Sequence, residues 1–282
     1  MNILIADSGS SKTDWCFLRE NSPLVEIQTP GLNPYFLDRD GIESILLKEL
    51  APYIYFEKVD ELYFYGAGLG SEVNRNRLDD VISDQFSNAD IHLETDMLGA
   101  ARGLFGKDEG IACIAGTGSN GCLYKNGTIV QQLPSLGYIL GDEGSGTYLG
   151  KQLIKLWLTN ELPLELKVKF EEKYRYSRSQ LLEIIYRQPN PNIFLAGFAG
   201  FFAANISHPE INSIVMEGFS RLIQQMVMKV DNFATFPIGF CGSIAWHFQD
   251  QLREAASLQG IVIHTVVKNP MSGLQKYHST EI

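Results

Sequence analysis

The chain is organised around one stretch, Ile111-Ala-Cys-Ile-Ala-Gly-Thr-Gly-Ser-Asn-Gly-Cys122. Its first five residues form an apolar run that predicts a buried strand, and the apolar run Cys122–Tyr124 predicts the strand that returns. The turn Gly116–Ser119 between them has no bulky side chain to cover its backbone, so several N–H groups can point at one anion, and its hydroxyls add donors. The stretch therefore predicts a hairpin whose tip suits a phosphate, although Gly-Thr-Gly-Ser also occurs in ordinary hairpins.

A second hairpin of the same kind opens the chain. Strands are predicted at Asn2–Ala6 and Trp15–Leu18, with the turn Asp7-Ser-Gly-Ser-Ser-Lys-Thr-Asp14 between them. This turn lacks the spacing of a Walker loop and no helix follows it immediately, so by itself it is interpreted as a polar hairpin. A carboxylate that leads a hydroxyl-rich hairpin can, however, hold the water shell of a metal beside a phosphate. Because two such hairpins are much less expected by accident than one, we interpret them together.

Beyond the hairpins, predicted strands alternate with predicted helices in both halves. In the first half, strands are expected at Leu24–Gln28, Glu61–Tyr65 and Ile91–Glu94, and helices at Asp40–Leu50, Ser71–Phe86 and Met97–Leu104. In the second half, helices are expected at Glu143–Leu158, within 163–188, at Glu210–Phe233, from Ala245 and at Pro270–Tyr277, and strands at Pro237–Cys241 and Ile261–Val266. The segment Asn192–Ala204 is apolar and rich in alanine. Strands that alternate with helices after an initial meander favour a mixed α/β fold. Both halves begin with a glycine-turn hairpin, which is weak support for a duplicated domain.

Length and charge bound the class of protein. The 282 residues suffice for two domains, and the short polar segment Phe105–Gly110 places the boundary so that the domains are 1–107 and 108–282. A hydrophobic content of 45% with 20% charged residues is typical of a globular protein with ample core. The net charge of −10, with no cluster of Lys or Arg, disfavours nucleic acid and anionic membranes as partners. No apolar run reaches membrane-spanning length and no signal-peptide pattern opens the chain, so we expect a cytoplasmic location.

The four cysteines are Cys16, Cys113, Cys122 and Cys241. They lie in apolar contexts and lack the spacing of metal ligands. We therefore expect buried thiols in a reducing compartment.

Two polar residues follow predicted strands and are candidates for binding or catalysis. Asp96 comes directly after the strand Ile91–Glu94, at the strand-to-helix junction where α/β sheets bind ligands. An N-cap aspartate is the ordinary interpretation, but phosphoryl transfer to a hydroxyl needs one positioned carboxylate base, and the two hairpins favour that role. Asn33 precedes Pro34 and is held extended, with its amide available to a ligand or to an Asx turn, of which the turn is favoured by sequence alone.

Four motifs in this order resemble one family: Asp7-x-Gly-x-Ser-Lys-Thr13, Ala115-Gly-Thr-Gly-Ser119, Gly137-Tyr-x-Leu-Gly-Asp-Glu-Gly-Ser145 and Gly239-Phe-Cys-Gly-Ser243. From Ile3 to Leu274 the chain resembles the actin-like ATPase superfamily, specifically its N-acetylglucosamine kinase (BadF/BcrA-type) branch. The resemblance implies two actin-like ATPase (ribonuclease H-like) domains, each a mixed sheet with flanking helices, around an interdomain cleft. It also implies a homodimer.

The resemblance assigns roles position by position, with ATP and Mg²⁺ as cofactors. Asp96 would take the proton from the 6-hydroxyl of the sugar, and Asp7 would hold Mg²⁺ through water. The phosphate-1 loop would comprise Asp7, Gly9, Ser10, Ser11, Lys12 and Thr13. The phosphate-2 loop would comprise Gly116, Thr117, Gly118 and Ser119, and the adenosine would lie against Gly242 and Ser243. The sugar would be bound by Asn33, Gly137, Tyr138 and Asp142.

The function implied is an ATP-dependent hexosamine kinase that makes a sugar 6-phosphate, with N-acetylglucosamine or glucosamine as substrate. Three alternatives stay open at this point. The branch contains ATPases that activate dehydratases or reductases through a shared iron–sulfur cluster, for which Cys113 and Cys122 are the only cysteines close in sequence. A non-catalytic sugar sensor would not need both Asp7 and Asp96, and a zinc-containing sugar kinase would need a Cys/His cluster that the sequence lacks.

Overall fold

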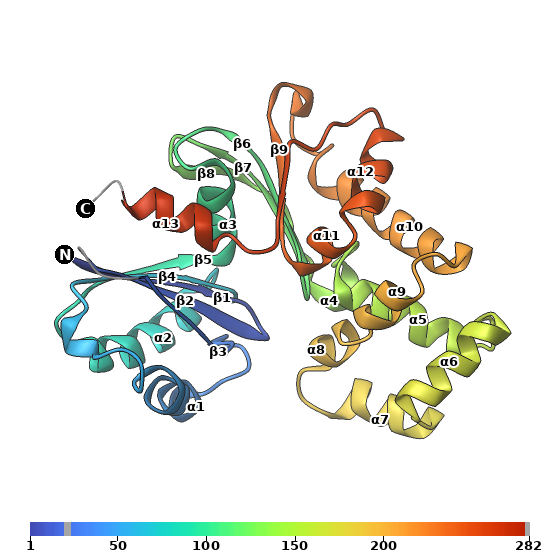
Figure 1. The fold of residues 1–282 in the computed structure, drawn as a ribbon, viewed down its shortest axis with the longest axis horizontal. Helices are drawn as coiled ribbons and strands as arrows, with labels where there is room; N and C mark the ends of the chain where they lie inside the picture. Colours follow the sequence, from blue (N-terminus) through green and yellow to red (C-terminus); the bar gives the residue numbers. More distant parts are fainter. Residues whose placement is uncertain (20–23, 280–282) are drawn as a thin grey trace. The chain divides into compact units, whose positions relative to one another are not determined.

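The first sheet contains the strands β1 (Asn2–Ser8), β2 (Lys12–Arg19), β3 (Val25–Pro30), β4 (Glu61–Gly66) and β5 (Asp90–Thr95). The structure is a computed structural model that describes residues 1–19 and 24–279. The five strands lie in the order β3-β2-β1-β4-β5 (Figure 1). β1 pairs antiparallel with β2 and parallel with β4, which pairs parallel with β5. The opening hairpin is therefore central to the sheet, as a nearly continuous apolar strand requires.

Helices cover both faces of this sheet (Figure 1). One face carries α1 (Arg39–Ile45), which continues as a π-helical turn at Leu46–Leu50, and α2 (Glu72–Gln85); a 3₁₀ turn lies at Phe56–Lys58. The other face carries α3 (Asp96–Phe105) and α13 (Met271–Ser279). Leu4 and Ala6 of β1 belong to the core under α1 and α2. Ile3 and Ile5 are also buried and, by strand alternation, serve the opposite face.

The second sheet contains β6 (Gly110–Ala115), β7 (Ser119–Lys125), β8 (Thr128–Gln132), β9 (Ile238–Cys241) and β10 (Thr265–Val267). Its order is β10-β9-β6-β7-β8, and β9 pairs parallel with both β6 and β10. Taken from the other edge, β8-β7-β6-β9-β10 repeats the order of the first sheet, with a hairpin strand at the centre. This agrees with the predicted duplication and confirms the predicted mixed α/β class.

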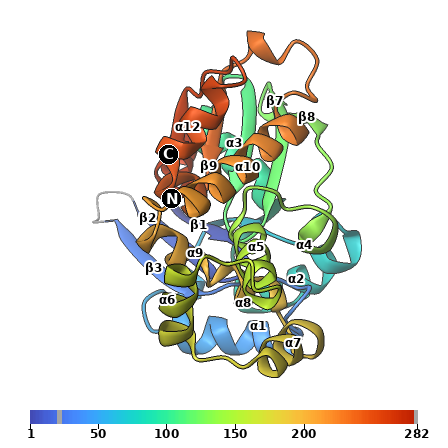
Figure 2. The ribbon, with the colours of Figure 1, turned by 90° about the vertical axis from the view of Figure 1, so that its right-hand side faces the viewer.

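The core of the second half is formed by β6, β9 and the helices of that half, of which α4 (Gly137–Leu140) alone contributes no buried residue. The helices are α4, α5 (Gly146–Leu158), α6 (Leu164–Tyr174), α7 (Arg178–Arg187), α8 (Pro191–Ala196), α9 (Ala199–Ala204), α10 (Pro209–Met226), α11 (Ser243–His247) and α12 (Gln249–Ser257), with a 3₁₀ turn at Phe233–Thr235. α10 packs against α12 and α5, and α5 packs against α8 (Figure 2). Along α10, Ile211, Val215, Phe219 and Leu222 recur at helical spacing on the buried side.

The chain divides into two compact units. The first comprises Met1–Gly110, Tyr124–Val130 and the segment from Asn269, and the second comprises Ile111–Leu123 and Gln131–Lys268. The chain end returns to the first unit through α13, which packs on α3. The division into domains 1–107 and 108–282 stays a prediction. No helix in the described ranges is long and apolar enough to span a membrane.

Most predicted elements are confirmed, and the errors concern their ends and two short elements. The helix predicted from Glu143 begins at Gly146, because Ser145 caps it through a hydrogen bond from the Tyr148 N–H (3.1 Å). The predicted strand Ile261–Val266 is reduced to β10, and the predicted helix Glu210–Phe233 ends at Met226. α4 and β8 were not predicted.

Candidate active site

The first hairpin has a short tip, Gly9–Ser11, between β1 and β2. The sequence predicts a longer turn from Asp7 to Asp14, and this prediction is wrong. Asp7 pairs with Asp14, and Ser8 pairs with Thr13, inside the sheet. Strand pairing continues because the buried hydroxyls of Ser8 and Thr13 hydrogen-bond each other at 2.8 Å and need no solvent.

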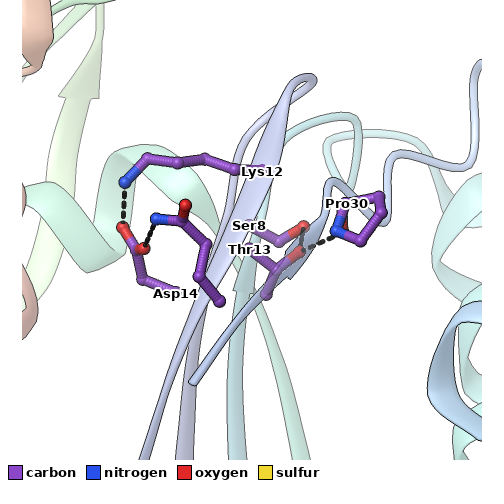
Figure 3. A network of polar contacts seen from close by, with 6 residues as sticks. Ser8, Lys12, Thr13, Asp14 and Pro30 are labelled. Carbon is purple, nitrogen blue, oxygen red and sulfur yellow. Dashed lines mark hydrogen bonds and ion pairs between the residues drawn. The ribbon is translucent and has the colours of Figure 1, made fainter. Parts of the chain in front are cut away.

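Lys12, the lysine of this hairpin, is paired with an acidic neighbour. Its Nζ lies 2.5 Å from Asp14 Oδ2, and Asp14 Oδ1 accepts a hydrogen bond from Gln28 Nε2 at 2.6 Å (Figure 3). The Lys12 side chain is 47% exposed. An ion pair that is this exposed contributes about 0–1 kcal/mol to stability. Lys12 can therefore leave Asp14 at little cost, and its contact with phosphate stays a prediction.

Asp7 and Asp96 lie at the same edge of the first sheet. Asp7 is the penultimate residue of β1, and Asp96 directly follows β5, two strands away across β4. Two strand spacings place these strand ends about 10 Å apart. Burial raises the pKa of Asp7 to about 7, and the Asp14 and Asp96 carboxylates contribute to this rise while Lys12 opposes it. The edge therefore gathers carboxylates that repel one another.

Asp96 is the first residue of α3, and the N-cap role belongs to its neighbour Thr95. Thr95 Oγ1 accepts a hydrogen bond from the Leu98 N–H at 3.3 Å, and Asp96 Oδ1 accepts one from the Met97 N–H at 2.8 Å. Burial raises the pKa of Asp96 to about 6, and hydrogen bonds from backbone N–H groups lower it in part. A carboxyl group with a pKa near 6 is suited to accept a proton at neutral pH.

Asn33 is buried in the segment after β3, and both ends of its amide are engaged. Its Oδ1 accepts a hydrogen bond from the Tyr35 N–H (3.0 Å), which is the expected Asx turn, and its Nδ2 donates to Ser10 Oγ (3.1 Å). Gly31 in the same segment has no room for a side chain, because a Cβ would lie 2.4 Å from the Gly9 carbonyl oxygen. The structure thus brings Asn33 against the tip of the first hairpin, and its contact with a sugar stays a prediction.

The tip of the second hairpin, Gly116–Gly118, is held from behind by the start of α5. The Gly146 N–H donates to the Gly116 carbonyl oxygen (2.8 Å), and the Thr147 N–H (3.1 Å) and hydroxyl (2.6 Å) both donate to the Thr117 carbonyl oxygen. These two carbonyl oxygens are therefore directed at a helix N-terminus. An anion-binding turn requires such an arrangement, because its carbonyl oxygens would otherwise repel the anion.

Asp142 lies against the same tip with a left-handed backbone, at φ +60°. Its Oδ1 accepts a hydrogen bond from the Ser119 N–H at 3.1 Å, and a Cβ on Gly118 would lie 2.9 Å from its Oδ2. Burial raises the pKa of Asp142, while the Ser119 N–H and the Lys151 ammonium lower it. The Ser119 N–H, which the sequence assigns to phosphate, is thus taken by a carboxylate. The Ser119 hydroxyl is buried and has no partner among the described residues.

Lys151, on α5, was missed by the sequence reasoning. Its Nζ donates to the carbonyl oxygens of Tyr138 (2.5 Å) and Gly141 (3.2 Å), which belong to α4 and the residue after it. Burial lowers the pKa of Lys151, and acidic neighbours, Asp142 first, oppose this. Lys151 therefore fixes the segment that carries the candidate sugar residues Gly137, Tyr138 and Asp142. No motif singles it out, because its role exists only once α4 folds back onto α5.

Gly242 and Ser243 follow β9 at the start of α11. Gly242 has a φ of +126°, and a Cβ there would lie 2.3 Å from the Ala115 carbonyl oxygen, so only glycine fits against the base of the second tip. Ser243 is exposed and begins α11. The placement leaves Ser243 accessible to a ligand, and the adenosine contact stays a prediction.

The four cysteines are free and buried, which confirms that part of the prediction. Burial raises the pKa of Cys16 to about 11 and that of Cys122 to about 12, and it also raises the pKa of Cys113. Within residues 1–19 and 24–279, no group of three or more His, Cys, Asp or Glu side chains is placed to hold a metal ion.

The chain matches no protein-family model and no curated protein. Among solved structures, it is 40% identical to a protein of Porphyromonas gingivalis described as a "Putative N-acetylglucosamine Kinase", with a TM-score of 0.93 over 99% of both chains. The chain belongs to the N-acetylglucosamine kinase family. A second protein of that description, from Chromobacterium violaceum, is 18% identical with a TM-score of 0.76 over 98% of both chains.

The fold of this N-acetylglucosamine kinase family member is shared more widely. A ROK family glucokinase from Streptomyces griseus, solved with glucose and AMPPNP, is 16% identical with a TM-score of 0.58 over 99% of both chains. The two five-stranded mixed sheets with flanking helices are those of the actin-like ATPase fold. The predicted family and fold class are both confirmed.

Proposed function

We propose that this chain is an ATP-dependent kinase that phosphorylates the 6-hydroxyl of an amino sugar, with N-acetylglucosamine as the first choice and glucosamine as the competitor. One observation carries the proposal. In a chain 40% identical to a "Putative N-acetylglucosamine Kinase", Asp96 stands at the carboxyl edge of the first sheet with a pKa of about 6. Phosphoryl transfer to a hydroxyl uses a carboxylate that accepts the hydroxyl proton.

Asp96 acts as the base in this proposal. Its Oδ1 is held by the Met97 N–H, so its second oxygen accepts the proton of the 6-hydroxyl. The sugar oxygen forms a bond to the γ-phosphorus, the bond from that phosphorus to the leaving ADP oxygen breaks, and the proton passes to Asp96. A positioned base of this kind contributes about 10²–10⁴-fold to the rate.

Asp7 is proposed to hold Mg²⁺ through water. The residues present fit a cation, because burial and the carboxylates of Asp14 and Asp96 raise the pKa of Asp7 to about 7. A cation at this edge would relieve a repulsion that the fold itself creates. Mg²⁺ bound there would neutralise charge on the ATP phosphates.

The remaining roles are proposed on the same family basis. In the first unit, the ATP phosphates contact Gly9, Ser10, Ser11, Lys12 and the backbone of Thr13, whose hydroxyl is buried against Ser8 and Pro30. In the second unit, they contact Gly116, Thr117, Gly118 and Ser119, whose tip α5 supports, and the adenosine contacts Gly242 and Ser243. The sugar contacts Asn33, Gly137, Tyr138 and Asp142. We also propose a cytoplasmic homodimer, which light scattering of the purified protein would test.

A substrate panel tests the proposal. ADP release is measured with N-acetylglucosamine, glucosamine, N-acetylmannosamine, glucose and no sugar, and the product is located by phosphorus NMR. We expect an amino sugar to stimulate turnover and Asp96→Asn to lower kcat by about 10²–10⁴-fold, while the exposed Asp231→Asn control keeps the wild-type rate. No stimulation by any amino sugar, with basal hydrolysis unchanged in Asp96→Asn, contradicts the proposal. A stoichiometric iron–sulfur cluster in the purified protein would support the activator ATPase instead.

A further inference from the structure

A chain of hydrogen bonds lies beneath the tip of the first hairpin. The Leu32 N–H donates to Ser8 Oγ (3.0 Å), the hydroxyls of Ser8 and Thr13 lie 2.8 Å apart, and Thr13 Oγ1 donates to the Pro30 carbonyl oxygen (3.2 Å). Figure 3 shows the two hydroxyls facing each other beside Pro30. Ser8, Thr13 and Leu32 are completely buried.

The direction of this chain follows from its protons, because each hydroxyl has one proton to donate. The proton of Thr13 goes to the Pro30 carbonyl oxygen, so the proton of Ser8 goes to Thr13 and a lone pair of Ser8 accepts the Leu32 N–H. The two hydroxyls therefore connect the carbonyl group and the N–H group on either side of Gly31. Every member of the network is satisfied.

The segment held in this way carries Asn33. Pairing of β3 with β2 ends at Pro30, so Leu32 and Asn33 lie beyond the ladder. The Ser8 hydroxyl attaches the Leu32 backbone at this point, one residue before Asn33. Asn33 Nδ2 then reaches Ser10 Oγ on the phosphate-1 tip at 3.1 Å. The Ser8 hydroxyl thus helps to position the Asn33 amide through the backbone, without a hydrogen bond to the Asn33 side chain itself.

We infer that Ser8 is a positioning residue for the sugar: its buried hydroxyl, which Thr13 holds in place, sets the position of Asn33 through the Leu32 N–H. The inference rests on the proposed function, in which Asn33 contacts the sugar. Thr13, assigned to phosphate from the sequence, has its hydroxyl committed to Ser8 and Pro30 and acts in the same chain of hydrogen bonds. Removing the Ser8 hydroxyl leaves the Leu32 N–H buried and unpaired, whereas the Pro30 carbonyl oxygen keeps a second donor, the Thr29 hydroxyl (3.1 Å). Ser8 therefore matters more than Thr13.

The test compares Ser8→Ala, Thr13→Val and the control Thr29→Val in the full-length protein. Thr29→Val leaves the buried Trp15 Nε1 without its partner, so it loses stability in the same sheet without touching Leu32. We expect Ser8→Ala to raise the KM for N-acetylglucosamine about tenfold, as an unpaired buried group predicts, with KM for ATP within about twofold. Thr13→Val raises the KM for N-acetylglucosamine by less than Ser8→Ala does, because the Pro30 carbonyl oxygen keeps its second donor.

A double-mutant cycle with Asn33→Ala separates positioning from general loss of stability. If Ser8 acts through Asn33, Ser8→Ala adds no further rise in sugar KM when Asn33 is already alanine. Additive effects, or an equal rise in sugar KM in Ser8→Ala and Thr29→Val, overturn the inference while the kinase assignment stands. A wild-type protein that phosphorylates no amino sugar overturns both.

Discussion

Three carboxyl groups of the candidate site, on Asp7, Asp96 and Asp142, have raised pKa values, and burial is the largest cause in each. Buried carboxylates reduce the stability of the fold, and groups with perturbed pKa values are concentrated at functional sites. Their partners differ: Asp142 is held by the Ser119 N–H, whereas Asp7 has the carboxylates of Asp14 and Asp96 near it. We therefore expect the three residues to respond differently to pH and to substitution.

The ionisation of Asp96 is expected to set the acidic limb of the pH–rate profile. As the base it must be ionised, and its pKa is about 6. We expect kcat/KM for the sugar, measured at saturating Mg·ATP, to be level above pH 7 and to fall about tenfold per pH unit below pH 6. Asp96→Asn would remove that limb along with most of the rate. A level profile down to pH 5 in the wild-type protein would show that Asp96 is not the base.

Removal of the Asp7 charge is expected to stabilise the folded protein. Its pKa rises from 3.8 to about 7 on folding, so the folded state prefers the protonated form. The stability associated with that proton is complete below pH 3.8 and is lost as pH rises towards 7. At pH 8, Asp7→Asn should stabilise the metal-free protein, by at most about 4 kcal/mol, while abolishing activity.

Thermal unfolding of Asp7→Asn at pH 8 and pH 4 checks this prediction. The gain should be present at pH 8 and nearly absent at pH 4, where Asp7 is largely protonated when folded. Asp231→Asn, which removes an exposed carboxylate, is the control and should change neither value. Equal melting temperatures for Asp7→Asn and wild type at pH 8 would mean that Asp7 is not destabilising.

Some site residues were accessible to sequence reasoning and others were not. Asp96 could be found because it follows a strand, and the Gly116–Ser119 tip because small residues separate two apolar runs. Ser8 and Lys151 could not, because their partners, Leu32 and the α4 carbonyl groups, are brought to them only by the folded chain. A hydroxyl or an ammonium group leaves no sequence pattern when its hydrogen-bond partners are backbone atoms of a distant segment.

At the level of elements, α4 is contacted by one charged side chain of α5, Lys151. α4 is four residues long and none of its residues is buried, so packing does little to hold it. Lys151 donates to the carbonyl oxygens of Tyr138 and Gly141. We expect Lys151→Met to loosen the Gly137–Gly141 segment and to raise the sugar KM about tenfold, because two carbonyl groups lose a charged donor.

The Lys151 prediction is checked by steady-state kinetics with a conservative variant. Lys151→Arg retains a charged donor and should recover part of the sugar affinity, although its planar group differs in shape. Lys155→Met, one helical turn further along α5 and exposed, is the matched control and should leave the KM unchanged. A wild-type sugar KM in Lys151→Met would show that α4 holds its shape without it.

The exposure of α4 and β8 explains why the sequence did not predict these two elements. Leu136 and Ile139, at 57% and 74% exposure, do not form a buried stripe, so no helical period predicts α4. β8 is also largely exposed and carries polar residues, which hides its strand character. The central strands β1 and β6 were predictable because they are buried on both faces and read as apolar runs.

For the whole molecule, the duplication of a domain was the predictable feature, whereas the strand order and the path of the chain end were not. A glycine turn after the first strand of each half indicated the duplication, and the structure adds that each sheet places this first strand at its centre. The sequence places Pro270–Tyr277 at the end of the second half. In the structure, the segment from Asn269 belongs to the first unit, so that unit uses both the beginning and the end of the chain.

The contact that secures the chain end is a close approach of two glycines. A Cβ on Gly273 of α13 would lie 1.8 Å from the Gly103 carbonyl oxygen of α3, so α13 must shift to accept any side chain. We expect Gly273→Ala to lower the free energy of unfolding by about 1–3 kcal/mol, measured by urea denaturation. Gly200→Ala on α9, where nothing lies within 4 Å of the new Cβ, is the control and should instead stabilise by about 0.5–1 kcal/mol. If both variants unfold alike, the α3–α13 contact does not hold the end of the chain on the first unit.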